Sequence, residues 1–294
     1  MAAYMTPLNF AKKFFELDVF LYEQEATAST GSGGYVPPTG WKRLRADNYR
    51  LGHSQWRDLF WRDIAPHFNK PVKATVRPIS GGDEEIEFRS AHEAFRHYRL
   101  PFVGKGSPEH VQLATQLVYR FRKVSTSLED FMAKDFVGLD CNGFVGGYYQ
   151  RILQGLDWKA AATQADRDPG PTTLMDDLHA LGADVKDTSQ LESNGTYIFV
   201  WCDDDGKIIN PQKGVANSYG HVMITEPRTL KGSPGAQTIQ VVEATGSGGR
   251  KLRSKDYTIK SVKRATVKQR ETAVFFVDRG DPKLMPVRIS RLKI

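Results

Sequence analysis

The stretch from Gly138 to Ile152 constrains the fold most, because it places a cysteine at the start of an amphipathic run. Counted from Cys141, apolar and aromatic side chains recur at the spacing of one helix face: Phe144, Val145, Tyr148, Tyr149 and Ile152. We therefore expect a helix that carries Cys141 at its N-terminal end. A helix N-terminus has about half a positive charge and unpaired N–H groups, and both favour a reactive thiolate. A buried, unreactive thiol is the alternative, and this stretch alone leaves both interpretations open.

Composition limits the chemistry that the chain can use. It has 294 residues and only two cysteines, Cys141 and Cys202. Two cysteines exclude a disulfide framework, and no cysteine and histidine have the spacing of a structural zinc site. We therefore expect no metal and no other cofactor, and we expect Cys202 to pack rather than react. The hydrophobic fraction of 40% suffices for a sizeable core, and no run of about 18 apolar residues predicts a membrane span.

The formal net charge of +7 favours anionic partners, and the positive charge is concentrated near the C-terminus. From Arg250 to Arg270 there are nine basic residues and one acid, Asp256. Only Tyr257 interrupts this stretch, so it does not predict an aromatic stacking platform for nucleic acid. We expect a solvated face that is attracted to an anionic polymer, and no specific nucleic-acid partner.

The N-terminal hundred residues predict a mixture of helices and strands. In chain order we expect a short helix within 6–25, a loop over 26–40, a helix over 55–64, a hairpin of 72–79 with 84–88, and a helix from Ser90 to His97. The break from Pro101 to Ser107 predicts a boundary, which gives an α/β N-terminal extension of unknown role (1–105) and a second domain (106–294). The first residues do not resemble a secretory signal, because Lys12 and Lys13 interrupt any apolar stretch.

The second domain predicts helices followed by strands. Pro108 begins a helix that Ser107 caps, the Cys141 helix follows, and a third helix runs from Leu174 to Leu181. We expect strands over Thr196–Trp201, His221–Thr225, Thr238–Ala244 and Ala273–Asp278. Asp205-Gly206 is typical of a hairpin turn.

A nucleophilic cysteine needs a base and a group that orients that base. His221 is the best base candidate, since it opens an apolar strand that would fix its ring, and His110 is the second candidate. Glu243 is the candidate for the orienting group because it shares a strand face with Ile239 and Val241. A carboxylate on an inward face needs a partner, which a histidine on the neighbouring strand would supply. The alternatives are a structural histidine and a Glu243 that faces solvent.

These residues carry a resemblance to a known family. The segment Asp140-Cys141-Asn142-Gly143-Phe144-Val145 resembles the Asp-Cys-Ser-Gly-Phe/Leu-Val signature of NlpC/P60 cysteine peptidases, which cut amide bonds in peptidoglycan stem peptides. Three later segments resemble family strands in the same order: Thr196–Val200, Gly220–Ile224 and Val241–Ala244. The resemblance covers roughly residues 108–278, and three motifs in the right order are moderately specific.

The resemblance implies a papain-like α+β fold, with helices packed on an antiparallel sheet, and a cysteine amidase or endopeptidase. By this match Cys141 is the nucleophile, His221 the base and Glu243 the orienting residue. Asn142 stands where the family commonly has Ser, and Phe131–Gly138 lacks the Tyr-x-x-Gly-Gly segment that usually lies upstream of the cysteine. These departures indicate a divergent member.

Peptidoglycan lies outside the cytoplasm, whereas the sequence predicts synthesis there without a signal peptide. This contrast favours delivery by another machine, either as an antibacterial effector that an immunity protein neutralises in the producing cell, or as a phage-associated lysin. Two other function classes stay open. One is a catalytically inactive papain-like binding module, and the other is a cysteine-dependent acyltransferase or deamidase acting on a protein.

Overall fold

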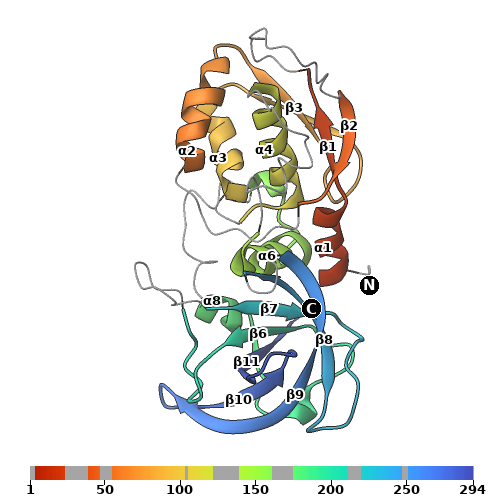
Figure 1. Cartoon of the computed structure of the whole chain (residues 1–294), viewed down its shortest axis with the longest axis vertical. Coiled ribbons are helices and arrows are strands. Elements are labelled where there is room, and N and C mark those ends of the chain that lie inside the picture. Colours follow the sequence, from red (N-terminus) through yellow and green to blue (C-terminus); the bar gives the residue numbers. More distant parts are fainter. Residues whose placement is uncertain are drawn as a thin grey trace. The chain divides into compact units, whose positions relative to one another are not determined.

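The computed structural model describes residues 4–23, 39–46, 55–102, 105–121, 139–160, 175–210, 220–246 and 251–293. Their contacts divide the chain into two compact units, whose elements are labelled in Figure 1. Unit 1 comprises Met1–Ala11, Cys141–Gly155 and Arg167–Ile294, and unit 2 comprises Lys12–Asp140 and Leu156–Asp166. Each unit is therefore built from separate stretches of sequence. The division into two units does not show whether residues 106–294 fold on their own. The domain boundary near residue 105 therefore stays a prediction.

Unit 1 is built around a seven-stranded antiparallel sheet. Strands β6 to β11 pair in chain order, each with the next. Strand β11 also pairs with β6, and this pairing closes the six strands into a ring. A short seventh strand, β5, pairs with the end of β11. The strands are β5 (Gly182–Asp184), β6 (Tyr197–Trp201), β7 (Val222–Thr225), β8 (Thr238–Thr245), β9 (Lys251–Val267), β10 (Arg270–Asp278) and β11 (Met285–Leu292).

Alternate residues along part of each of these strands contribute to one hydrophobic cluster. Successive side chains of a strand point to opposite faces, so a period of two marks the face that the strands share. The cluster takes residues from all six strands of the ring, among them Phe199, Met223, Val241, Tyr257, Phe275 and Val287. Glu243 continues the same face of β8 beyond Ile239 and Val241 and is fully buried.

Two helices cover the opposite face of the strands. Helix α6 (Cys141–Tyr148), which continues as a π-helical turn over Tyr149–Leu153, contacts β7 and β8 (Figure 1). Helix α8 (Met175–Ala180) contacts β6 and β11. The second face of β6, β7 and β8 is consequently buried as well, and its apolar side chains include Ile198, Val200, Val222, Ile224 and Val242. Burial of both faces explains why β6 and β7 are continuous apolar runs.

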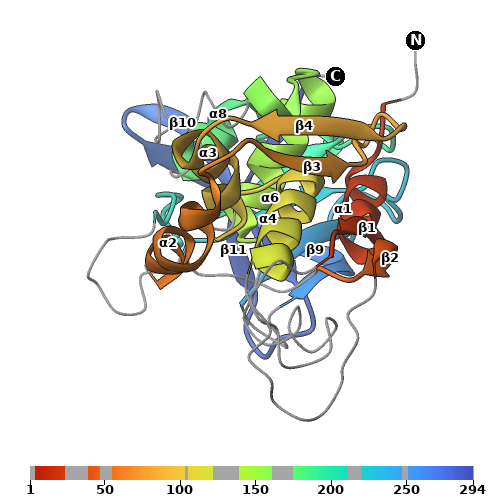
Figure 2. The ribbon, with the colours of Figure 1, turned by 90° about the horizontal axis from the view of Figure 1, so that it is seen from above.

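Unit 2 is centred on α4 (Pro108–Phe121), which contacts α3, β1 and β3 (Figure 2). Its two hairpins are β1 (Leu17–Leu21) with β2 (Gly40–Leu44), and β3 (Val72–Val76) with β4 (Glu84–Phe88). Its other helices are α2 (Gln55–Leu59), extended by a π turn (Phe60–Ile64) and a 3₁₀ turn (Ala65–His67), and α3 (Ala91–Phe102). Helix α1 (Pro7–Phe15) runs from one unit into the other.

Buried glutamines of α4 take the place of a third strand beside β3. Gln116 accepts a hydrogen bond from the Thr75 N–H through Oε1 (3.1 Å) and donates to the Thr75 carbonyl through Nε2. Gln112 does the same with the backbone of Arg77, at 2.7 and 2.9 Å. Gln112 and Gln116 are four residues apart and therefore share one face of the helix. Thr75 and Arg77 are two residues apart and therefore present their backbone groups at the same edge, so each glutamine meets one of them. Helix α4 thereby satisfies the backbone groups of an edge strand.

Most of the expected elements are confirmed. The α+β class holds, and so do the hairpin of β3 and β4, the helices that begin at Ala91, Pro108 and Cys141, and four strands of the sheet. The helix from Ala91 continues past His97 to Phe102. A helix lies within 6–25 as expected, but the following run Leu17–Leu21 is a strand. Strands β9 and β11 were not anticipated. The expected loop over 26–40 falls almost entirely outside the described residues, as do Thr172, Thr173 and Leu174.

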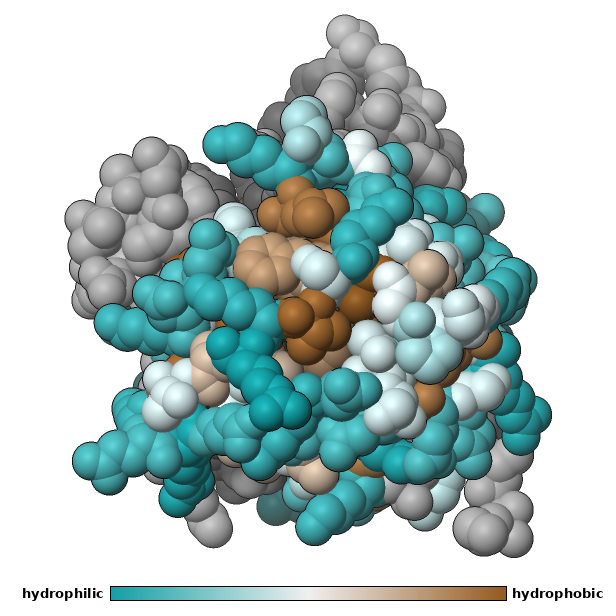
Figure 3. Space-filling view, turned by 90° about the horizontal axis from the view of Figure 1, so that it is seen from below, coloured by the Kyte–Doolittle hydropathy of each residue, from teal (hydrophilic) through white to brown (hydrophobic). Residues whose placement is uncertain are grey.

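The surface seen from below is mostly hydrophilic, with a small group of hydrophobic side chains near its middle (Figure 3). Among the described residues, the exposed large hydrophobic side chains are Tyr4, Val262 and Leu284. Within the same described ranges no helix is long and apolar enough to cross a membrane.

Candidate active site

Cys141 is the first residue of α6 and is buried, with 3% of its surface exposed. Phe144, Val145 and Tyr148, which follow on the same helix, are also buried, and the rings of Phe144 and Tyr148 pack against Phe10 of α1. The Cys141 thiol donates to Oδ1 of Asn142, 3.2 Å away. The sequence prediction of a cysteine at a helix N-terminus is therefore confirmed, and its sulfur lies beside a carboxamide.

His221 directly precedes β7, on a strand that neighbours β8. Its carbonyl accepts a hydrogen bond from the Trp201 N–H (2.8 Å), which fixes its backbone to β6. The ring is buried, and its Nε2 lies 2.6 Å from Oε2 of Glu243. The side chain of Cys141 lies close enough to the ring to help raise its pKa. The structure thus brings together all three residues that the sequence indicated: Cys141, His221 and Glu243.

Both carboxylate oxygens of Glu243 have partners. His221 holds Oε2, and Nε of Arg253 donates to Oε1 at 2.9 Å. Arg253 lies on β9, directly opposite Glu243 in the antiparallel register. Burial by itself would raise the pKa of Glu243, but the hydrogen bond and charge of His221, together with the charge of Arg253, lower the pKa to about 2. Glu243 is therefore ionised at neutral pH.

The ionised carboxylate decides how the imidazole is protonated. A carboxylate only accepts hydrogen bonds, so Nε2 of His221 must carry the proton that it shares with Glu243. Nδ1 is then the ring nitrogen that remains for the Cys141 thiol. Burial would lower the pKa of His221, but hydrogen bonds to Cys141 and Glu243 and their charges raise the pKa to about 9. The geometry consequently favours an imidazolium at neutral pH.

Tyr257 is a further buried neighbour of this site. It lies on β9 and is completely buried; burial and the charge of Glu243 both raise the pKa of its phenol. Neither Arg253 nor Tyr257 was assigned to the site from the sequence, because both lie inside the basic stretch 250–270 that we interpreted as a solvated face. A basic residue opposite Glu243 on the neighbouring strand would have indicated Arg253. Finding it requires the register between β8 and β9, and β9 was not predicted from the sequence.

The remaining sequence candidates have other surroundings. His110 lies in unit 2, where its Nδ1 is 2.9 Å from the hydroxyl of Ser107 and its ring stacks on His97 at 5.6 Å. Cys202 is buried at the end of β6, and burial raises the pKa of its thiol to about 12, so it packs rather than reacts. Among the described residues no group of three or more His, Cys, Asp or Glu side chains could hold a metal ion.

We compared the chain with protein-family models, with curated proteins and with solved structures, and none of them matches. The interpretation of the site therefore depends on its own geometry and on the motifs that lead to it.

Proposed function

We propose that the chain is a cysteine-dependent amide hydrolase with a papain-like, NlpC/P60-type catalytic site. The single observation that carries this proposal is the position of the His221 ring, whose Nε2 lies 2.6 Å from Glu243 and whose pKa the neighbouring Cys141 side chain helps to raise. A base that touches both a thiol and a buried carboxylate is the arrangement that activates a nucleophilic cysteine.

In the proposed reaction, the thiol proton of Cys141 resides on Nδ1 of His221, which gives a thiolate–imidazolium pair, and the thiolate Sγ attacks the amide carbonyl carbon. The backbone N–H of Cys141, at the first position of α6, stabilises the oxyanion, a contribution of about 3–4 kcal/mol per donor in a well-formed site. The C–N bond breaks as the imidazolium gives its proton to the leaving amine. Water, deprotonated by Nδ1, then cleaves the thioester and releases the acid and the thiol.

Glu243 acts through His221 and not on the substrate. Its charge holds the proton on Nε2, so that Nδ1 is the nitrogen that exchanges a proton with sulfur. Arg253 in turn neutralises the second oxygen of Glu243 and fixes the carboxylate. Glu243 and Arg253 are therefore positioning residues.

Peptidoglycan stem peptides are the substrate class that we propose. The support comes from the order of the Cys, His and Glu motifs and from the net charge of +7, which favours an anionic polymer such as the cell wall. We propose delivery to the cell wall as an antibacterial effector with an immunity protein, or as a phage-associated lysin.

Digestion of purified peptidoglycan fragments, followed by mass spectrometry, tests the proposal. The wild-type chain should release new amine and carboxylate ends, and Cys141→Ala should lose this activity by more than about 1000-fold. Cys202→Ala is the matched control, since it removes the other buried thiol and should retain cleavage. Cleavage that survives Cys141→Ala would contradict the proposal.

Expression in bacteria with and without an added periplasmic signal tests the location of the target. Lysis that requires the signal and Cys141 supports a cell-wall substrate, whereas toxicity only without the signal contradicts it. Transfer of an acyl group to a protein, or deamidation of one, would instead point to the acyltransferase or deamidase alternative. An unreactive Cys141 would point to the inactive binding module.

A further inference from the structure

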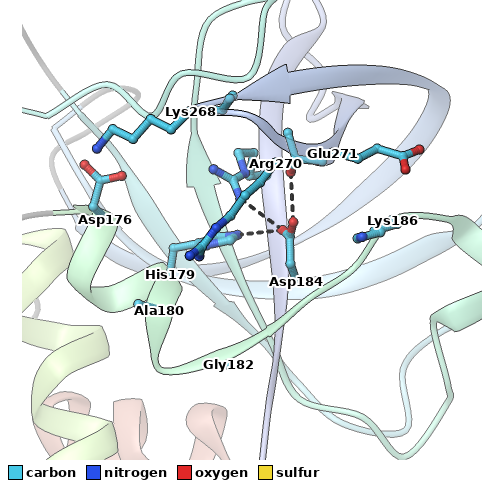
Figure 4. A pocket seen from close by; sticks show the side chains of 12 residues that line it. Asp176, His179, Ala180, Gly182, Asp184, Lys186, Lys268, Arg270 and Glu271 are labelled. Carbon is cyan, nitrogen blue, oxygen red and sulfur yellow. Dashed lines mark hydrogen bonds and ion pairs between the residues drawn. The ribbon is translucent and has the colours of Figure 1, made fainter.

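A second concave site lies in unit 1 and shares no residue with the candidate active site. It is a cavity of about 910 Å³ between α8, β5 and the turn that joins β9 to β10. Figure 4 shows the charged side chains that line it, which come from all of these elements. A volume of this size is within the range of small-molecule sites in proteins, about 300–1,000 Å³.

The acid at the centre of the cavity is already neutralised. Asp184 accepts hydrogen bonds from Thr272 (2.9 Å) and Arg288 (3.2 Å), and its Oδ1 lies 3.3 Å from Nε2 of His179. These contacts outweigh burial and lower the pKa of Asp184. Asp184 with Arg288 is thus a structural ion pair in the wall of the cavity, and it leaves no net negative charge there.

The other charges leave an excess of positive charge. Glu271 pairs with Arg264 on β9, outside the cavity, at 3.7 Å. Because that pair is largely exposed, Glu271 still counts in the lining, which then holds Lys186, Lys268 and Arg270 against two acids, Asp176 and Glu271. In the part of the chain that the structure describes, these three cations have no hydrogen-bond or ion-pair partner for their side chains, whereas Asp176 accepts from Asn210 at 2.6 Å. One positive charge therefore stays uncompensated in the lining.

The turn that carries Lys268 has a strained backbone. Lys268 and Gln269 both have positive φ, +48° and +65°, in the two-residue connection between Val267 and Arg270. Such hairpin turns prefer Asn-Gly, because residues with a Cβ rarely adopt this conformation. A lysine at this place projects its side chain across the cavity toward Asp176, while Arg270 reaches toward His179 (Figure 4). Strain of this kind commonly accompanies a functional residue.

We propose that this cavity binds a phosphate monoester, with Lys186, Lys268 and Arg270 holding the phosphate group. A phosphate monoester carries a charge of about −1.5 to −2 at neutral pH, and the excess of positive charge in the lining attracts such an anion. Arginine and lysine together are the usual partners of phosphate oxygens, and arginine adds bidentate geometry. The remaining volume accommodates the organic part of the ester. This site is independent of Cys141 and extends the molecule beyond the proposed hydrolase.

Calorimetric titration of the full-length chain with glycerol 3-phosphate, inorganic phosphate and succinate at constant ionic strength tests the site. We expect saturable binding of glycerol 3-phosphate, weaker binding of inorganic phosphate and no saturable binding of succinate. Arg270→Gln should weaken binding by about tenfold or more, since a charge-assisted hydrogen bond is lost. Lys263→Gln is the matched control: it removes one exposed charge of β9 outside the cavity and should leave binding unchanged.

The double variant Lys268→Asn with Gln269→Gly separates binding from stability. It supplies the preferred turn residues, so the melting temperature should rise while the affinity for glycerol 3-phosphate falls by about tenfold. If Lys268 had only a structural role, the melting temperature would change without a loss of affinity for glycerol 3-phosphate. The proposal is overturned if no phosphate compound binds saturably, if Lys263→Gln weakens binding as much as Arg270→Gln, or if succinate binds as tightly as the phosphate ester.

Discussion

Nε2 of His221 lies 2.6 Å from Oε2 of Glu243, although 22 positions separate the two residues in the chain. The contact arises because β7 and β8 are antiparallel neighbours, so that the start of one strand lies beside the end of the other. Arg253 reaches the second oxygen of Glu243 from β9, the next strand of the sheet. Three successive strands thereby hold one base in place, and the following predictions depend on this chain of contacts.

Glu243→Gln should move the pH dependence of hydrolysis. The variant keeps the shape of the side chain but removes the charge that helps raise the pKa of His221 to about 9. We expect the falling limb of kcat/KM to move to lower pH, with at least about tenfold lower activity at neutral pH; orienting carboxylates of catalytic triads contribute up to ~10⁴.

Glu243→Asp is the conservative control for this experiment. It restores the negative charge, so the falling limb should return toward that of the wild type even where the shorter side chain lowers kcat. A pH profile that is the same in Glu243→Gln and in the wild type would show that Glu243 does not act on His221.

The His221–Glu243 pair should also make the free energy of unfolding depend on pH in two ranges. The pKa of Glu243 falls from 4.5 to about 2 on folding, so its contribution is present above 4.5 and is lost as the pH falls through about 2. The pKa of His221 rises from 6.5 to about 9, so its contribution is present below 6.5 and is lost as the pH rises through about 9.

The contribution of the pair is therefore complete between about 4.5 and about 6.5. Urea unfolding across this range should show a stability difference between the wild type and Glu243→Gln that is largest in the window and shrinks on both sides. A difference that stays constant with pH would contradict the proposed ionisation of the pair.

Arg253→Met should destabilise the fold by about 1–3 kcal/mol, because it leaves one oxygen of a fully buried carboxylate without its partner. Arg264→Met on the same strand is the matched control. Arg264 and its partner Glu271 are largely exposed, and such pairs contribute about 1 kcal/mol or less. Chemical denaturation of both variants measures the difference. Equal destabilisation would mean that Arg253 acts only as a surface charge.

Gln112→Leu should destabilise the fold by about 1–3 kcal/mol, although it replaces a polar side chain by an apolar one inside a helix. The change leaves the Arg77 N–H and carbonyl without the side-chain partners that they have on α4. Gln154→Leu, at an exposed position after α6, should change stability by less than about 0.5 kcal/mol. Melting curves of the two variants provide the comparison. Equal shifts in melting temperature would show that the hydrogen bonds of Gln112 to the Arg77 backbone do not stabilise the fold.

The sequence predicts the site better than it predicts the sheet. Cys141, His221 and Glu243 follow from local patterns: a helix face after the cysteine, and apolar strands around the other two. Strand β9 escapes prediction because its outward residues are cations and its curved course exposes many of them, so its alternation is hidden. Strand β11 has the same character, with Arg288 and Arg291 between apolar residues.

Arg253 and the phosphate cavity could not be predicted for a related reason. The contact of Arg253 with Glu243 depends on the register between β8 and β9. The cavity depends on four separate segments that meet in space. Neither feature leaves a periodic pattern in the sequence. The buried glutamines of α4 were equally hidden, since polar residues within a helix normally indicate its solvent face.

The rate at which iodoacetamide alkylates Cys141, measured across pH with peptide mapping to exclude Cys202, tests the central claim most directly. The account predicts that Cys141 reacts well below pH 8, where an ordinary thiol reacts slowly, and that His221→Ala removes this reactivity while Arg264→Met preserves it. Alkylation of Cys141 that begins only in the range of an ordinary thiol, or that is unchanged in His221→Ala, would contradict the account.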